Sequence, residues 1–185
     1  MLRLLIALSL LLPMSVLARD WQVDAAKSSL TFKGSYQGEA FAGKFKKFDA
    51  TIAYDAADLA TSKFEVSVDL VSADTGSSER DDTLKTSDFF DTGKFPKARF
   101  VTESFAKTTD GGVEAKGSLT IRDQTKPVTL KVKFAGNGPS TGPGLATLDV
   151  DGTLQRADFG LGTGKDWADI SADVSVHSHL VLSAK

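Results

Sequence analysis

Apolar and polar residues alternate along most of this chain, and this period of two constrains its fold more than any other feature. Alternation of this kind is typical of a half-buried β-strand that turns one apolar face inward. In residues 63–70, for example, the apolar positions are Phe64, Val66, Val68 and Leu70. Comparable sets predict strands within residues 30–36, 41–45, 48–54, 64–70, 99–106, 113–121, 128–134, 148–154 and 174–182.

Turn signals separate these strands at hairpin spacing. Asp110, Gly111 and Gly112 form a tight turn, a second turn is expected at Asp123 and Gln124, and Pro127 is expected at the start of the next strand. Residues 136–144, rich in Gly and Pro, read as a flexible connection within one domain. The fold class is therefore all-β: an antiparallel, lipocalin-like barrel of about eight strands, whose closure removes exposed edges.

The alternation is interrupted in residues 73–100. Polar helix formers surround Leu84, and we expect a short helix over residues 77–85 that is capped by Ser77. Acidic residues in the first turn face the positive end of the helix dipole. Phenylalanines follow in an otherwise polar loop, so this helical insertion must lie on a hydrophobic surface. They are Phe89, Phe90, Phe95 and Phe100.

The first 18 residues have the pattern of a secretory signal peptide. Arg3 precedes an apolar run over residues 4–12, Pro13 follows, and Ala18 stands at the expected cleavage site. A transmembrane anchor is disfavoured because the run is shorter than the roughly 18 residues that span a bilayer. We expect residues 1–18 to be removed and residues 19–185 to form the barrel domain.

Composition excludes several classes of function. The formal net charge of -2 provides no broad positive field, so a nucleic-acid partner is not expected. The chain has no Cys, which rules out disulfides and Cys-ligated metal, haem or cluster sites, and we expect no cofactor. Twelve Phe against two Trp and two Tyr favour an interior without polar groups.

An eight-stranded barrel is just wide enough either to fill with its own side chains or to hold one small ligand. Several inward positions are small, and two interpretations are open: the small residues leave space for a ligand, or they relieve crowding where strands bend. These positions are Gly34, Gly43, Ala50, Ala115, Gly117 and Gly152.

The order and spacing of several motifs resemble the YceI-like family over nearly all of the mature chain. These motifs are Val23-Asp24, Ser28-Ser29-Leu30-Thr31-Phe32, Gly43-Lys44-Phe45 with Phe48, Arg80-Asp81 with Leu84, Ser87-Asp88-Phe89-Phe90-Asp91, Phe95-Pro96 with Phe100, Gly117-Ser118-Leu119-Thr120-Ile121, Thr125-Lys126-Pro127-Val128 and Arg156-Ala157-Asp158-Phe159-Gly160. The resemblance implies a lipocalin-like barrel, exported to the bacterial periplasm, that holds an isoprenoid, quinone or fatty-acyl lipid for transport or storage.

Residues 156–169 resemble the branch of this family that is associated with membrane cytochromes of the b561 type. The resemblance therefore implies such a cytochrome as an alternative partner, and it would suit a quinone ligand. A homodimer of two barrels is a further option for assembly.

A lipid tail would have ample driving force, since each methylene moved into an apolar lumen contributes roughly 0.8 kcal/mol. Each lining candidate can instead be ordinary core. The candidates are Phe32, Phe41, Phe45, Phe48, Ile52, Val66, Val68, Leu119, Leu130 and Val132 from the strands, and Arg80, Leu84, Phe89, Phe90 and Phe95 from the insertion, where the phenylalanines would form a lid.

Arg80 has two interpretations: it binds a phosphate or carbonyl head group at the mouth, or it forms an ion pair with Asp81 or Asp88. The same ambiguity applies to Arg156 and Asp158.

Support for catalysis or metal binding is thin. Residues 160–165 resemble a phosphate-binding loop but lack the surrounding βαβ unit, so we interpret them as a plain loop. His177 and His179 share one strand face, opposite the inward apolar residues, and are expected to face solvent. No nucleophile elbow or Cys is present, so we expect no enzyme. Carboxylate chemistry remains the one enzymatic alternative.

Overall fold

The computed structural model of this chain describes residues 18–136 and 144–185. Most of the predicted signal peptide and most of the predicted connection over residues 136–144 lie outside the described residues.

The described residues form one antiparallel sheet and one α-helix. The helix is α1 (Ser78–Lys85), and four short 3-10 helices cover Leu59–Thr61, Leu70–Ser72, Arg156–Phe159 and Lys165–Trp167. The strands are β1 (Arg19–Val23), β2 (Ser29–Tyr36), β3 (Glu39–Phe45), β4 (Phe48–Tyr54), β5 (Lys63–Asp69), β6 (Ala73–Asp74), β7 (Lys97–Lys107), β8 (Val113–Ile121), β9 (Gln124–Gly136), β10 (Leu145–Gln155) and β11 (Asp173–Ala184).

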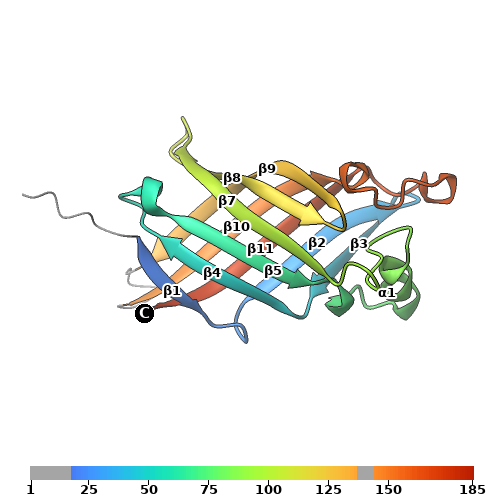
Figure 1. Cartoon of the computed structure of the whole chain (residues 1–185), viewed down its shortest axis with the longest axis horizontal. Coiled ribbons are helices and arrows are strands. Elements are labelled where there is room, and N and C mark those ends of the chain that lie inside the picture. Colours follow the sequence, from blue (N-terminus) through green and yellow to red (C-terminus); the bar gives the residue numbers. More distant parts are fainter. Residues whose placement is uncertain (1–17, 137–143) are drawn as a thin grey trace, which may run out of the picture.

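The sheet closes into a barrel of eight strands (Figure 1). Eleven strand segments make up these eight, because three of the barrel strands are each divided into two segments by a bend. β1 and β2 both pair with β11, and the continuous segments β3–β4 and β5–β6 pair with each other. Closure is visible at Trp21, which is paired with Ala184 of β11 on one side and with Ile52 of β4 on the other. The predicted antiparallel barrel is confirmed.

The helical insertion also forms where it was expected. Ser77 is the N-cap of α1, and its hydroxyl accepts a hydrogen bond from the backbone N–H of Arg80 at 3.5 Å. Glu79 and Asp81 occupy the first turn and Lys85 the last, as the helix dipole favours. α1 has no fully buried residue, but its Leu84 packs against the apolar cluster that contains Phe89 and Phe90. The helix and the loop that follows it therefore attach the insertion to the barrel together.

One predicted turn is wrong. The β8–β9 hairpin turns at Arg122 and Asp123, because Arg122 adopts the left-handed conformation with φ of 57°. β9 therefore begins at Gln124, and Pro127 lies inside the strand, paired with Ser118, rather than at its start.

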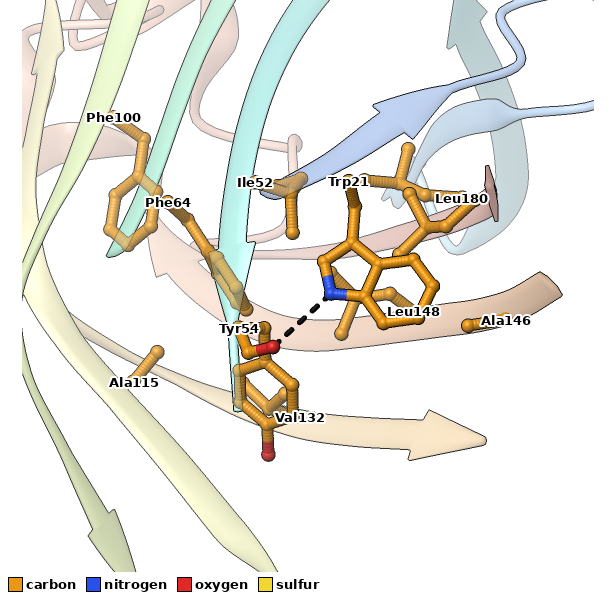
Figure 2. Close-up of a cluster of buried hydrophobic side chains, with 11 residues drawn as sticks. Trp21, Ile52, Tyr54, Phe64, Phe100, Ala115, Val132, Ala146, Leu148 and Leu180 are labelled. Carbon is orange, nitrogen blue, oxygen red and sulfur yellow. Dashed lines mark hydrogen bonds between the residues drawn. The ribbon is translucent and has the colours of Figure 1, made fainter. Parts of the chain in front are cut away.

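One end of the barrel is filled by aromatic side chains. We call this the aromatic cluster: Trp21, Tyr54, Phe64, Phe105 and Phe134. The rings of Tyr54 and Phe134 are 4.9 Å apart and those of Phe64 and Phe105 are 4.8 Å apart. Figure 2 shows the Trp21 indole N–H donating to the backbone carbonyl of Tyr54, at 3.1 Å. Burial raises the pKa of the Tyr54 hydroxyl. This end is closed to a ligand.

The inward glycines accommodate neighbouring side chains. A Cβ on Gly43 would lie 2.3 Å from the Phe32 ring, and one on Gly152 would lie 2.4 Å from Leu130. Both distances are far below van der Waals contact, so the space next to these glycines is already occupied. The structure thus supports the second interpretation of these positions, relief of crowding. Ala50 differs, since it lines an open cavity.

Candidate functional site

A cavity of about 630 Å³ runs through the barrel from the aromatic cluster to α1. Phe64 lines it at the filled end, and Arg80 and Thr83 line it at the other end. In Figure 1 these are opposite ends of the molecule: β1 lies at one, and α1 with the connection between β10 and β11 lies at the other. The walls are mostly Phe, Leu, Ile and Val side chains.

Most of the predicted lining residues do line this cavity. From the strands these are Phe32, Phe41, Phe45, Phe48, Ile52, Val66, Val68, Leu119 and Leu130, and from the insertion Arg80, Leu84, Phe89 and Phe90. Phe89 and Phe90 are only 6% and 8% exposed, so they cover the cavity as part of its wall. Contact of these residues with a ligand stays a prediction.

Phe95 and Val132 do not line the cavity, and for these two residues the prediction is wrong. Val132 points inward as expected but packs into the core around the aromatic cluster, because β9 extends beyond the cavity toward the filled end. Phe95 is half-buried in the insertion, where its backbone N–H donates to the carbonyl of Asp91.

Other lining residues were missed. Val174, Val176 and Leu180 of β11 were predicted to face inward by the same alternation but were not named as lining candidates. Trp167 and Ile170 come from the irregular connection between β10 and β11, where no periodic signal marks them.

The cavity reaches the surface beside α1. Among its described lining residues, Tyr36, Glu79 and Arg80 are exposed. β6 pairs with β3 only at Lys44 and Phe45. On that edge no strand described by the structure lies beside the rest of β3, so the barrel wall is open there. The opening is therefore bordered by the β2–β3 hairpin and by α1. We call it the mouth, formed by Tyr36, Thr75, Ser77, Glu79, Arg80 and Thr83.

Arg80 has no carboxylate within 4.0 Å among the described residues, so the predicted ion pair with Asp81 or Asp88 is wrong. Its Nε donates to Thr75 Oγ1 at 3.4 Å and its Nη2 donates to the Thr75 carbonyl at 3.3 Å. Asp81 instead accepts from the backbone N–H of Thr75 at 2.8 Å and from its hydroxyl at 2.7 Å. Asp88 accepts from the Trp167 indole at 3.0 Å.

Arg156 organises the connection between β10 and β11. Its five N–H donors all meet backbone carbonyls: Ser171 at 3.0 Å, Leu161 at 2.8 Å, Trp167 and Ile170 at 3.1 Å, and Gly162. Neither interpretation of Arg156 from the sequence, head-group binding or an ion pair, matches this arrangement. The guanidinium lines one side of the cavity, with its five donors all used by backbone carbonyls.

Arg122 joins the insertion to that same connection. Its Nη1 donates to the carbonyls of Ser87 and Phe89 at 3.1 Å and to that of Gly160 at 3.3 Å. Its Nε is buried and has no hydrogen-bond partner within residues 18–136 and 144–185. No sequence pattern pointed to this residue, because its partners are backbone carbonyls distant in the chain.

The cavity offers little for catalysis or metal binding. Glu79 is the one carboxylate among its described lining residues, whereas general acid–base chemistry on paired carboxylates needs two. The described residues contain no group of three or more potential metal ligands. His177 and His179 pair through Nδ1 with Asp151 and Asp149, at 2.8 Å and 2.7 Å, on the neighbouring strand β10.

None of the helices in the described part of the chain has the length and apolar character to cross a membrane.

Similarity to known sequences covers almost the whole barrel. The YceI-like domain profile matches residues 21–182. A UPF0312 protein of Shewanella denitrificans is 37% identical over 161 residues, covering 85% of this chain and 84% of that protein. A UPF0312 protein of Vibrio cholerae is 34% identical over 154 residues, covering 81% and 82%.

Solved structures share the same architecture. The crystal structure of BcnA from Burkholderia cenocepacia superposes with a TM-score of 0.79 at 31% identity, covering 86% of this chain and 99% of that one. A polyisoprenoid binding domain from Saccharophagus degradans superposes with a TM-score of 0.64 at 17% identity, covering 89% and 98%, which shows a shared fold alone. With a domain profile matched from residue 21 to residue 182 and relatives aligned over most of their own length, this chain belongs to the YceI-like family.

Proposed function

We propose that this protein holds the hydrocarbon chain of a lipid, an isoprenoid or a similar long tail, inside its barrel. The observation that carries the proposal is the 630 Å³ cavity, walled by apolar side chains and open at the mouth. Membership of the YceI-like family supports it, as does the shared fold of the polyisoprenoid binding domain from Saccharophagus degradans. Quinone and fatty-acyl lipids fit the same walls, in a transport or storage role.

The size of the cavity sets the length of tail that it can enclose. If each carbon occupies roughly the 30 Å³ that a water molecule takes in the liquid, the cavity holds on the order of 20 carbons, or about four isoprene units. At roughly 0.8 kcal/mol per methylene, burial of such a tail contributes on the order of 16 kcal/mol, and the cost of association and ordering, roughly 4–15 kcal/mol, reduces the net affinity. A longer tail would leave its remaining units outside the mouth.

The site of action that we propose is the periplasm, with the predicted signal peptide over residues 1–18 as the export signal. Long hydrocarbon tails do not leave a membrane for water unaided. An exported carrier of this kind would store such lipids or move them from one membrane to another.

Native mass spectrometry of the mature protein, purified from its own host, tests the proposal directly. We expect a bound lipid that organic extraction releases, and uptake of polyprenyl or quinone probes by the emptied protein. Absence of any retained lipid, together with no uptake of these probes, would refute it.

A pair of variants separates the cavity from the outer wall. Ala50 lines the cavity, and the next residue of β4, Thr51, is exposed. Ala50→Trp should reduce the longest tail that binds, whereas Thr51→Trp should leave tail binding unchanged. Equal effects of the two substitutions would contradict a ligand inside the barrel.

Partnership with a membrane b561-type cytochrome is the second proposal. Residues 163–166, within the stretch that resembles the cytochrome-associated branch, are exposed and available to a partner. Co-purification of such a cytochrome with the tagged protein is the expected result, and loss of the complex on replacing residues 163–166 is its control. Failure to co-purify would remove this proposal and leave the carrier function untouched.

A further inference from the structure

We propose that His177 and His179 together bind one transition-metal ion of the kind that prefers imidazole ligands, such as Cu²⁺ or Zn²⁺, on the outer wall of the barrel. This function is separate from the proposed carrier function and does not depend on it. Two side chains supply the ligands, since the described residues contain no group of three or more potential metal ligands. Water molecules would complete the coordination of the ion.

The period of two in β11 places both imidazoles on one face of the sheet. Residues two apart on a strand are separated by roughly 6.6–6.8 Å along it, so their side chains can reach one ion between them. His177 also borders the cavity, but its imidazole is bonded to Asp151 on the outer face of β10. The two histidine side chains are 44% and 39% exposed, which gives an ion in solution access to both.

The two nitrogens of each ring have different roles. Nδ1 of His177 lies 2.8 Å from Asp151 Oδ1, and Nδ1 of His179 lies 2.7 Å from Asp149 Oδ1. An ionised carboxylate only accepts hydrogen bonds, so each Nδ1 must carry the hydrogen. In a neutral imidazole the lone pair is then on Nε2, and this is the nitrogen left for a metal.

Neither Nε2 makes a hydrogen bond within the described residues. Nε2 of His177 is 3.9 Å from Asp149 Oδ1, which is too long for a hydrogen bond but close enough for the carboxylate to favour a cation there. Histidines that bind metals typically donate their other ring N–H to a carboxylate, which fixes the tautomer and makes the binding nitrogen more basic. Both histidines already have such a partner.

The charges around the pair favour a cation. The acids that contact the rings, Asp149 and Asp151, lie on β10, and Lys133 and Lys131 are opposite them on β9, one strand further away. Within the part of the chain that the structure describes, neither lysine forms an ion pair with these acids. The residues opposite the pair on β2 carry no charge. The negative charge of the two carboxylates is therefore the closest to the imidazoles.

The donor set decides which ions bind. Imidazole nitrogen suits Cu²⁺, Zn²⁺ and Ni²⁺, whereas Mg²⁺ and Ca²⁺ prefer oxygen ligands. The affinity should be higher for Cu²⁺ than for Zn²⁺, in the general order of divalent metals. The chain has two His and no Cys, so no other imidazole or thiol competes for the ion.

Titration of the untagged mature protein with Cu²⁺, followed by calorimetry and electron paramagnetic resonance, tests the site. We expect one ion per chain bound by two nitrogens, which Zn²⁺ displaces and Mg²⁺ and Ca²⁺ do not. Loss of a hydrogen-bond partner behind a metal ligand costs roughly 10–100-fold in affinity, so Asp151→Ala should weaken binding about tenfold. His177→Gln and His179→Gln should each weaken it by more and leave one nitrogen bound.

Ser175→Gln is the matched control, since Ser175 is exposed on the same face of β11 and has no group that binds these ions well. It should leave the Cu²⁺ affinity unchanged. Circular dichroism of each variant shows whether the barrel is intact, and the number of bound nitrogens is a readout that a loosened strand pair would not change from two to one.

Several results would overturn the proposal. Two independent ions per chain, or an unchanged affinity in either histidine variant, would mean that the imidazoles do not share an ion. Competition by Ca²⁺ as strong as that by Zn²⁺ would assign the ion to the carboxylates. One ion per two chains would place the site between molecules, and no binding at all would leave the histidines as partners of the two acids only. The carrier function stands or falls separately, on lipid binding.

Discussion

Replacing Arg156 by Met removes the side chain that holds the connection between β10 and β11 against the barrel. Methionine keeps an unbranched stem of similar length but donates no hydrogen bond. The carbonyls of Ser171, Leu161, Gly162, Trp167 and Ile170 then lose their donors. Because every hydrogen bond given for Arg156 goes to a backbone carbonyl, the substitution leaves no acid without its partner.

The expected loss follows from these contacts. A hydrogen bond from a charged group contributes about 1.5–3 kcal/mol, but five such bonds do not add, since a released loop exposes its carbonyls to water. Release of the loop also exposes part of Phe159 and Leu161, which are 2% and 9% exposed, at about 1.5–3 kcal/mol for each fully buried side chain. We therefore expect the free energy of unfolding to fall by about 3 kcal/mol.

Urea unfolding and thermal melting measure this loss. In a domain of this size about 3 kcal/mol corresponds to a fall in Tm of roughly 6–12 °C. Arg99→Met is the matched control: Arg99 makes one exposed ion pair, to Glu65 at 2.6 Å, and such pairs contribute about 0–1 kcal/mol. If Arg156→Met is no more destabilising than Arg99→Met, the organising role assigned to Arg156 is wrong.

Two further predictions concern packing and pH. Gly43→Ala should lower the free energy of unfolding by about 1–3 kcal/mol, because its Cβ would lie 2.3 Å from the Phe32 ring. Gly93→Ala is the control, since the space around Gly93 is open. Equal midpoints of urea unfolding for the two variants would contradict this reasoning. The hydrogen bond from Lys46 lowers the pKa of the Asp74 carboxyl. The contribution of this carboxylate to the stability of the fold is therefore present above the ordinary pKa of an aspartate, and it is lost as pH falls through the lowered value. The difference in Tm between the wild type and Asp74→Asn should therefore shrink between pH 6 and pH 3, and a constant difference would refute this coupling.

Local pattern was enough to predict the fold. The alternation in residues 63–70 places Phe64, Val66 and Val68 on one face, and the structure turns that face inward. The cap at Ser77 follows from the same kind of information, because an N-cap depends on residues within one turn of it. Both are short-range properties of the backbone and its nearest side chains.

Long-range contacts escaped prediction. Arg122 and Arg156 bond to backbone carbonyls, which every residue carries, so no pattern of residue types announces their partners. Trp167 and Ile170 reach the cavity from an irregular connection without periodicity. The ion pair expected between Arg80 and Asp81 does not form for a related reason: the Asp81 carboxylate accepts the hydrogen bond of the Thr75 hydroxyl instead.

The residues by themselves determined which side chains face into the barrel, since that depends only on the period of two along each strand. How deep each of them lies was decided by the tertiary structure. Val132 and Leu130 share a face of β9, yet Leu130 lines the cavity and Val132 belongs to the filled end. Depth depends on how neighbouring strands are staggered when the sheet closes, and the stagger is a property of the whole ring of strands rather than of any one of them.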